Sequence, residues 1–505
     1  MKHLVEIAKI ITKKKIKKIE IFDDHALMDT QSKFNEFYEA LMTGKFKSDN
    51  EAAKHLYDAT PLDERYRQLK SRFRRRLLNT LFFLDVNLPA TSTYDQAYYS
   101  CNKNWALVKI LMANRADSTA ASLASQILTT ALNYRFADLI VNCARILRAN
   151  AAELGEEKLF EEYDYHIKQY ANILDAEIRS EEFYQRVILN YHTEFDENKD
   201  FMERLNTYCI ALDSLSQQYD SPVIKYNKYL VWSYRHEIMG DYTKMLEVCG
   251  EAEQYVEQNP IYYQSDRVHT IYLKKITAYL HLRTNLSGLS LFEAYETAFS
   301  RGSDTWFTFQ EYCFLYAMHA KHYESALTVF NETISFPGFK RTESEVQEKW
   351  HAFHAYLNYA LQYLYKGDMN WKEVIVKNFR VNKLLVQSLL FPKEQKIYII
   401  HISTAQLLYC IEDKNTRRLK DIIGILGGHL NKTFRKEEYY RVMQFIRLLQ
   451  QLLKADFVEK DMTNTEKYYR RLTEEATFLY RGLLRELEII PYEDLWKLIL
   501  ERLKK

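Results

Sequence analysis

The chain has 505 residues, of which only 12 are glycine and 7 are proline, against roughly 35 and 25 in a chain of average composition. With 47% hydrophobic and 27% charged residues it can build a large core, which excludes a disordered, collagenous or low-complexity chain. The formal net charge is +2, so no overall field attracts nucleic acid or an anionic membrane. Because hairpins and tight turns rely on glycine, this composition predicts an all-α fold of long helices.

The first residues argue against export. Lys2, Glu6 and Lys9 interrupt the apolar run that a signal peptide needs. The best uncharged stretch, residues 118–134, is too short to span a bilayer. The six cysteines are scattered without a CxxC pair, which predicts reduced, buried thiols and no zinc site: Cys101, Cys143, Cys209, Cys249, Cys313 and Cys410. We therefore expect a cytoplasmic protein with no membrane contact.

Residues 1–88 are expected to form a small basic helical domain. The first 80 residues hold 12 Lys and 6 Arg against 12 acidic residues. Ser48 followed by Glu51 is a capping box that opens a short helix, and Thr60-Pro61 predicts the start of a longer one. Along that longer helix apolar residues recur every three or four positions: Leu62, Tyr66, Leu69, Phe73, Leu77, Leu81 and Leu84.

Seven basic residues cover the other faces of the longer helix: Arg65, Arg67, Lys70, Arg72, Arg74, Arg75 and Arg76. Together with the basic run Lys13, Lys14, Lys15, Lys17 and Lys18, they can contact the phosphates of DNA or RNA. Docking of an acidic partner protein and a merely solvated face are the alternatives. The basic residues surround the apolar stripe and no triplet suited to base readout precedes them, which favours the solvated face.

Residues 89–390 contain a repeated pattern of paired helices. In the segment around Gly240-Asp241-Tyr242, a turn separates two amphipathic stretches, with Met245, Cys249 and Ala252 at packing positions and Asn259-Pro260 at the end. The same spacing recurs at Tyr134, Ala137, Val141 and Ala144, and at Tyr323, Ala326, Phe330 and Thr333. This pattern resembles the tetratricopeptide (TPR) repeat, although Ser233 and His236 depart from it.

The resemblance implies a TPR-like α-solenoid, a stack of antiparallel helix pairs whose concave groove binds a peptide, a helix or a partner subunit. Residues 391–505 would continue the solenoid as a helical extension. The aromatic run 306–316 is apolar around the whole helix, so it is either core or the lining of a groove. We expect the groove to include Trp232, His236, Trp306, Tyr312 and Tyr316, with core packing as the alternative.

No pattern for catalysis or cofactor binding stands out. The GILGG run lacks both the GxGxxG spacing and the GK[ST] ending of phosphate loops. Glu348 and His351 form one ExxH pair, which His354 could join, but a ferritin-like metal site needs two such pairs and two further glutamates. No GxSxG elbow occurs, and each cysteine lies in an apolar context. We predict no catalytic residue, no cofactor and no metal, and a protein that is not an enzyme.

The sequence thus predicts a non-enzymatic scaffold or adaptor that binds a protein or peptide partner. The alternative is a regulator that contacts DNA or RNA through the basic amino-terminal domain and senses a partner or ligand with its repeats. That arrangement resembles the repeat-containing, peptide-sensing regulators of bacteria.

Overall fold

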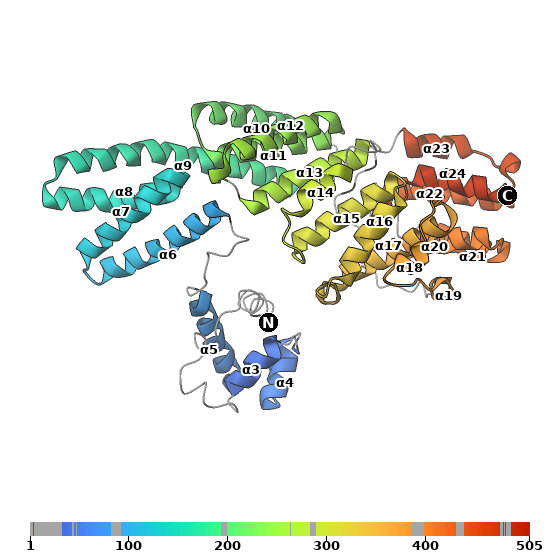
Figure 1. The fold of residues 1–505 in the computed structure, drawn as a ribbon, viewed down its shortest axis with the longest axis horizontal. Helices are drawn as coiled ribbons and strands as arrows, with labels where there is room; N and C mark the ends of the chain where they lie inside the picture. The colour runs from blue at the N-terminus through green and yellow to red at the C-terminus, as the bar shows by residue number, and fades with distance from the viewer. Residues whose placement is uncertain are drawn as a thin grey trace. The chain divides into compact units, whose positions relative to one another are not determined.

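The structure is a computed structural model. It describes residues 33–42, 45–46, 48–81, 92–192, 199–262, 264–282, 289–385, 398–430, 439–474 and 486–504, together with Leu4, Phe478 and Tyr480. Over these residues it has 22 α-helices and no strand (Figure 1). The all-α prediction is therefore confirmed. The basic run at residues 13–18 lies outside the described residues.

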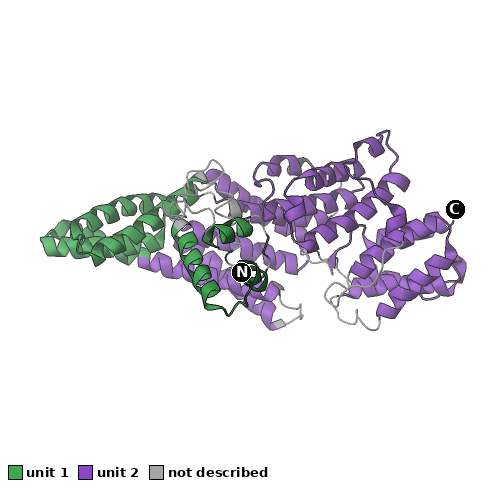
Figure 2. Ribbon diagram, turned by 90° about the horizontal axis from the view of Figure 1, so that it is seen from below, with its two compact units in different colours: residues 1–170 green, residues 171–505 purple. Residues whose placement is uncertain are grey.

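The chain divides into two compact units, residues 1–170 and 171–505 (Figure 2). Unit 1 contains α3 (Lys33–Met42), α4 (Asp49–Tyr57), α5 (Glu64–Thr80), α6 (Thr93–Ala113), α7 (Asp117–Tyr134) and α8 (Ala137–Leu154). The unit boundary falls within the long helix α9 (Glu157–His192).

Helices α3, α4 and α5 pack on one another around an aromatic core. The rings of Phe37 and Phe73 lie 4.8 Å apart between centroids, and Tyr66 packs beside them. Ser48 caps α4 by accepting the N–H of Glu51, as predicted. The predicted start of α5 at Thr60-Pro61 is wrong, because the cap is Asp63, whose carboxylate accepts the N–H of Arg65. Leu62 consequently lies outside the helix.

Unit 2 contains fifteen further α-helices in its described residues. They are α10 (Lys199–Gln218), α11 (Pro222–Ile238), α12 (Tyr242–Gln258), α13 (Ser265–Leu282), α14 (Leu289–Glu296), α15 (Asp304–His319), α16 (Tyr323–Ser335), α17 (Ser344–Tyr363), α18 (Trp371–Val374), α19 (Val381–Leu385), α20 (Tyr398–Glu412), α21 (Thr416–Leu430), α22 (Tyr440–Lys454), α23 (Thr465–Thr473) and α24 (Tyr492–Leu503).

Neighbouring helices of unit 2 pack on one another in chain order, from α10 to α13 and from α20 to α23 (Figure 1). Alternate helices also touch, since α13 packs against both α11 and α15. Glu311 on α15 pairs with Lys349 on α17, which extends this line by one helix. We call α11, α13, α15 and α17 the alternate row. The last helix, α24, packs back against α20 and α22.

One turn geometry recurs between consecutive helices. A residue with left-handed backbone, φ 50° to 72°, follows the first helix. The N–H of the residue after it donates to the carbonyl oxygen five positions before that residue. The left-handed residues of these six turns are Arg115, Arg135, Gly155, Gly240, Lys321 and Lys414. Only two of them are glycine, so the shortage of glycine did not show how many such turns the chain makes.

The turns test the register of the three predicted repeat units. Tyr242 and Tyr323 begin α12 and α16, each two residues after a left-handed residue, as predicted. Tyr134 is different, because it ends α7, and Ala137 begins α8 after the turn at Arg135. The predicted register of the first unit is therefore wrong by three residues.

Candidate functional site

Described residues between α23 and α24 lie against the alternate row of unit 2. They are Phe478, Tyr480 and 486–491, and we call them the docked segment. Phe478 is 8% exposed and Tyr480 is 1% exposed. Both contact side chains from helices more than 100 residues earlier in the sequence. The docked segment therefore shows what kind of chain the alternate row can hold.

Tyr480 occupies a polar site between α15 and α17. Its hydroxyl donates to the carboxylate of Glu311. Lys349 Nζ donates to both oxygens of that carboxylate at 2.9 Å and to the Tyr480 hydroxyl at 3.5 Å. The ring of Tyr312 meets the Tyr480 ring edge-on at 5.4 Å. Burial, together with the carboxylate of Glu311, holds the pKa of Tyr480 well above its usual range, so the phenol stays protonated and donates.

Phe478 lies two residues before Tyr480, against two histidines. Its ring centroid is 5.0 Å from that of His281 on α13 and 5.5 Å from that of His319 on α15. The guanidinium of Arg441 on α22 lies 5.9 Å from the same ring. Phe478 therefore packs against three side chains that can each carry positive charge, an arrangement that the negative face of an aromatic ring stabilises.

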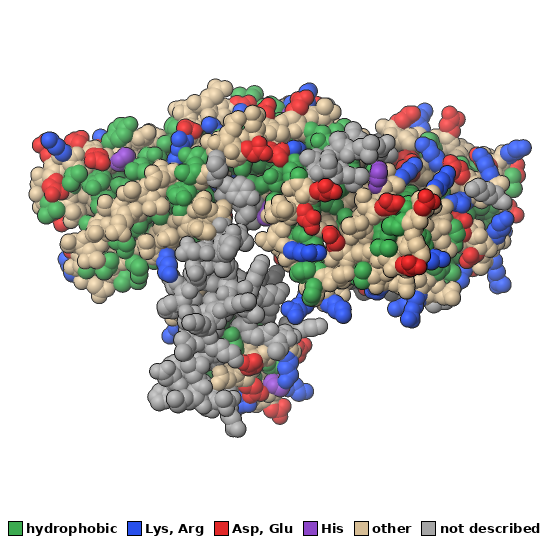
Figure 3. Space-filling view, in the orientation of Figure 1, with side chains coloured by type: hydrophobic (Ala, Val, Ile, Leu, Met, Phe, Trp, Pro, Cys, Tyr) green, Lys and Arg blue, Asp and Glu red, His purple; other side chains and the backbone are tan. Residues whose placement is uncertain are grey.

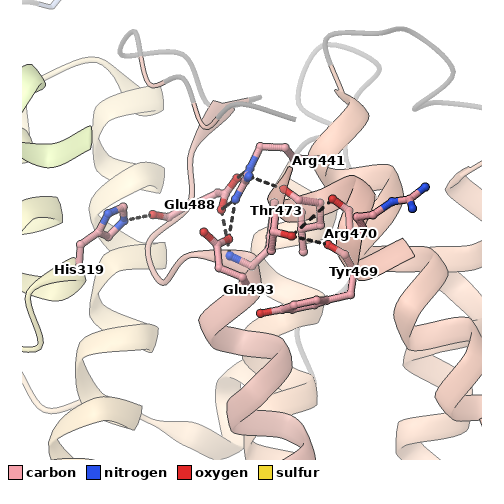
Figure 4. Close-up of polar contacts among 9 residues, drawn as sticks. His319, Arg441, Tyr469, Arg470, Thr473, Glu488 and Glu493 are labelled. Atoms are coloured by element: carbon pink, nitrogen blue, oxygen red, sulfur yellow. Dashed lines mark hydrogen bonds and ion pairs between the residues drawn. The ribbon is translucent and has the colours of Figure 1, made fainter. Parts of the chain in front are cut away.

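The backbone of the docked segment is fixed at Glu488 (Figure 4). His319 Nε2 donates to the Glu488 carbonyl oxygen at 2.6 Å. Arg441 binds the Glu488 carboxylate through two hydrogen bonds of 2.6 and 3.0 Å, and it also binds Glu493 at 2.6 Å. Burial lowers the pKa of Arg441, but the two carboxylates outweigh burial and raise it. The cation is therefore held charged within the protein.

A second buried ion pair lies further along the alternate row. Lys274 on α13 donates to Glu237 on α11, and Tyr191 donates to the same carboxylate at 2.5 Å. Lys274 Nζ also lies 3.2 Å from the centroid of the Tyr234 ring. Burial lowers the pKa of Lys274, while the carboxylate of Glu237 opposes this shift.

The four buried charges of the alternate row carry a sequence signal that the search for catalytic motifs missed. Glu237, Lys274, Glu311 and Lys349 follow one another at intervals of 37, 37 and 38 residues, with alternating sign. Each of these side chains belongs to a buried residue, less than a tenth exposed. A charged residue on a buried helix needs a partner. The alternating sign of these buried charges therefore indicates that each helix of the row contacts the next one in the row.

Three of the predicted groove residues lie on α15, and the structure separates them. Tyr312 contacts the docked segment through Tyr480. Trp306 and Tyr316 are each 1% exposed and lie in the core. Trp306 packs against Phe336, and Tyr316 packs against Phe292. Trp306 and Tyr316 therefore pack in the core, as in the alternative given for this helix. Of the three residues, only Tyr312 lies at the candidate site.

Trp232 and His236 lie together on α11, beside α10. Their rings stack at 5.6 Å, and Trp232 Nε1 donates to Asp213 on α10 at 3.3 Å. Arg235 covers the other part of the indole at 5.2 Å. Burial and the nearby Arg235 charge lower the pKa of His236. The structure thus places these two residues in contact with each other. Their role in lining a partner-binding groove stays a prediction.

The seven basic residues of α5 divide into two groups. Arg65 pairs with Asp63, Lys70 pairs with Asp49, and Arg76 lies over the ring of Phe34. The other four make no ion pair with the described residues: Arg67, Arg72, Arg74 and Arg75. On the face of unit 2 in Figure 3, acidic and basic side chains are interspersed. The four unpaired arginines are thus a local basic surface on α5.

The remaining chemical groups are enclosed. All six cysteines are buried and free, as predicted, and burial raises the pKa of Cys249 to about 12. His354 packs between Phe330 and Phe379. Over the described residues no three or more His, Cys, Asp or Glu side chains lie together in a way that could hold a metal ion. None of the described helices is long and apolar enough to cross a membrane.

Comparison of the chain with protein-family models, curated proteins and solved structures finds no match.

Proposed function

We propose that the chain is a TPR-like α-solenoid that acts as a non-enzymatic interaction module, binding a peptide segment of a partner protein along the alternate row of helices. The observation that carries this proposal is the docked segment. Side chains from α13, α15, α17 and α22 hold Phe478, Tyr480 and Glu488 of this segment. A partner's segment can use the same contacts.

The chemistry of these contacts suits peptide recognition. Aromatic side chains supply most of the binding energy at protein interfaces, and polar groups fix the orientation. Here Glu311 and Lys349 bind a phenol hydroxyl, and His319 binds a main-chain carbonyl. A main-chain contact is independent of the side chain at that position. His319 therefore fixes the backbone at this position, Arg441 favours a carboxylate there, and Glu311 with Lys349 selects a phenol.

Two features support the solenoid part of the proposal. The helices of the alternate row begin at Pro222, Ser265, Asp304 and Ser344, which are 43, 39 and 40 residues apart. A unit of about this length is one helix pair with its turns. The recurrent left-handed turn joins such pairs at Gly240 and Lys321. Both features are expected where helix pairs stack along one axis.

A selection of displayed random peptides on the full chain tests the proposal. Enriched peptides are then titrated into the wild type, into His319→Ala and into the matched control His322→Ala. His319 binds the main chain of the docked segment, whereas His322 lies exposed in the turn before α16. We expect His319→Ala to weaken binding by roughly tenfold and His322→Ala to leave it unchanged. The proposal would be refuted by enriched peptides whose affinity does not depend on His319 or Tyr312.

A second candidate function is contact with DNA or RNA through α5. The observation that favours it is the set of exposed, unpaired arginines within a three-helix group whose second and third helices succeed each other as in a helix–turn–helix. Arg72 and Arg75 lie three positions apart on the exposed face. They are the residues whose reversal of charge tests this function most directly.

A further inference from the structure

We infer that the partner segment carries two aromatic side chains two residues apart, the second of them a tyrosine, and that Phe478 and Tyr480 occupy their sites until such a segment displaces them. This inference rests on the proposed function. It adds the recognition motif and the means by which the chain controls its own site.

The spacing of the motif follows from the two subsites. The first subsite is formed by His281 and His319, and the second by Glu311, Lys349 and Tyr312. Phe478 lies in the first subsite and Tyr480 in the second, so the two subsites are filled by aromatic residues two positions apart. A segment with its aromatic residues at another spacing fills only one subsite.

The second subsite selects tyrosine over phenylalanine. Glu311 and Lys349 are each less than a tenth exposed, and the Tyr480 hydroxyl is bonded to both. A phenylalanine ring would leave the Glu311 carboxylate with one partner fewer, away from water. A buried group that loses a partner weakens binding by more than the gain from one ordinary hydrogen bond. We therefore expect roughly tenfold discrimination.

The docked segment is a competitor because it belongs to the same chain. An attached segment acts at an effective concentration in the millimolar range, so it keeps a weak external peptide out. The described contacts of Phe478 and Tyr480 on α13, α15 and α17 are all with side chains. Helix α13 also packs against α11, α12 and α15, and α15 packs against α14 and α16. These helices thus have partners of their own when the segment leaves.

The test uses a labelled synthetic peptide of residues 475–491, EATFLYRGLLRELEIIP, and the full chain. Fluorescence anisotropy compares its affinity for the wild type and for Phe478→Ala/Tyr480→Ala, whose own motif is removed. We expect the double variant to bind at least roughly tenfold more tightly, because the competitor is gone. Peptides with Phe478→Ala or Tyr480→Phe, and a receptor that also carries Glu311→Gln, should lose most of this gain.

Equal affinity for wild type and double variant overturns the inference. Failure of the double variant to fold, seen by circular dichroism, overturns it too, because the segment would then be a permanent part of the core. The milder receptor Tyr480→Phe keeps the ring and should bind the peptide several-fold more tightly than the wild type. If selected peptides depend on His319 but lack the aromatic pair, the proposed function stands and this inference fails. If no peptide depends on His319, both fail.

Discussion

His319 donates a hydrogen bond of 2.6 Å to the backbone oxygen of Glu488, which lies 169 residues later in the chain. The bond joins α15 to the docked segment at the residue whose carboxylate is bound by Arg441 (Figure 4). One residue of the segment is therefore held through its backbone by the alternate row and through its side chain by α22. A segment held in this way is positioned by both of the surfaces it touches.

Removal of the Tyr480 hydroxyl should destabilise the chain. Tyr480→Phe leaves the buried carboxylate of Glu311 with Lys349 but without the phenol. We expect a loss of about 1–3 kcal/mol in the free energy of unfolding, measured by urea denaturation. The matched control is Tyr365→Phe, because the half-buried Tyr365 also bonds to a glutamate, Glu324, but through a hydrogen bond that is exposed to solvent. The control should lose less than about 0.5 kcal/mol; equal losses would contradict a buried site.

Substitution of alanine for two glycines should change the stability of the chain in opposite directions. Gly240 has φ 70° in the turn before α12, and no atom crowds an added Cβ there. Gly240→Ala should therefore lower stability by about 1–2 kcal/mol through backbone strain alone. Gly250 lies inside α12 with equally open space, so Gly250→Ala should raise stability by about 0.5–1 kcal/mol. Urea midpoints of the two variants check this; shifts of the same sign would show that the turn is not left-handed.

Stability should fall in acid because of His354. Burial, with the charges of His351 and Lys377, lowers the pKa of His354 to about 4, against about 6.5 in an unfolded chain. The unfolded chain therefore binds the proton more tightly, and the contribution of His354, complete above pH 6.5, is lost as the pH falls towards 4. The loss at pH 4 is about 3 kcal/mol. His354→Leu should remove this part of the pH dependence, and identical pH profiles of the two proteins would exclude the mechanism.

The nucleic-acid function makes a prediction about salt. If Arg67, Arg72, Arg74 and Arg75 each contact a phosphate, log K for a generic duplex falls with log salt at a slope of about −3 to −4. Arg72→Glu/Arg75→Glu should reduce the slope by about 2 and weaken binding at low salt. The control Lys340→Glu/Arg341→Glu changes the net charge equally at exposed positions of unit 2. If both double variants bind like the wild type, α5 does not bind the duplex.

The parts of the fold that depend on local chemistry were predictable. Ser48 caps α4, and the Gly240 turn precedes the helix that Tyr242 begins, as the sequence indicated. The turn at Arg135 was not, because this residue has positive φ and the sequence does not distinguish it from other surface bases. That is why Tyr134 was assigned to the wrong side of its turn.

The candidate site was less predictable than the fold. Periodicity showed that the helix around Tyr312 is apolar on every side, but it could not tell which side meets the docked segment. Tyr480 reaches Glu311 across 169 residues, and no local pattern encodes such a contact. The regular spacing of Glu237, Lys274, Glu311 and Lys349 is a signal for the alternate row that the motif search did not use.

Photo-crosslinking from position 312 shows whether the docked segment and an added peptide bind at the same site. The full chain is prepared with p-benzoylphenylalanine in place of Tyr312, whose ring lies 5.4 Å from that of Tyr480. Mass spectrometry after illumination identifies what is attached. We expect attachment to the chain's own residues 478–490 in the free protein, and transfer to an added peptide that carries the aromatic pair. Attachment that stays within the chain at saturating peptide would show that the peptide does not bind at this site.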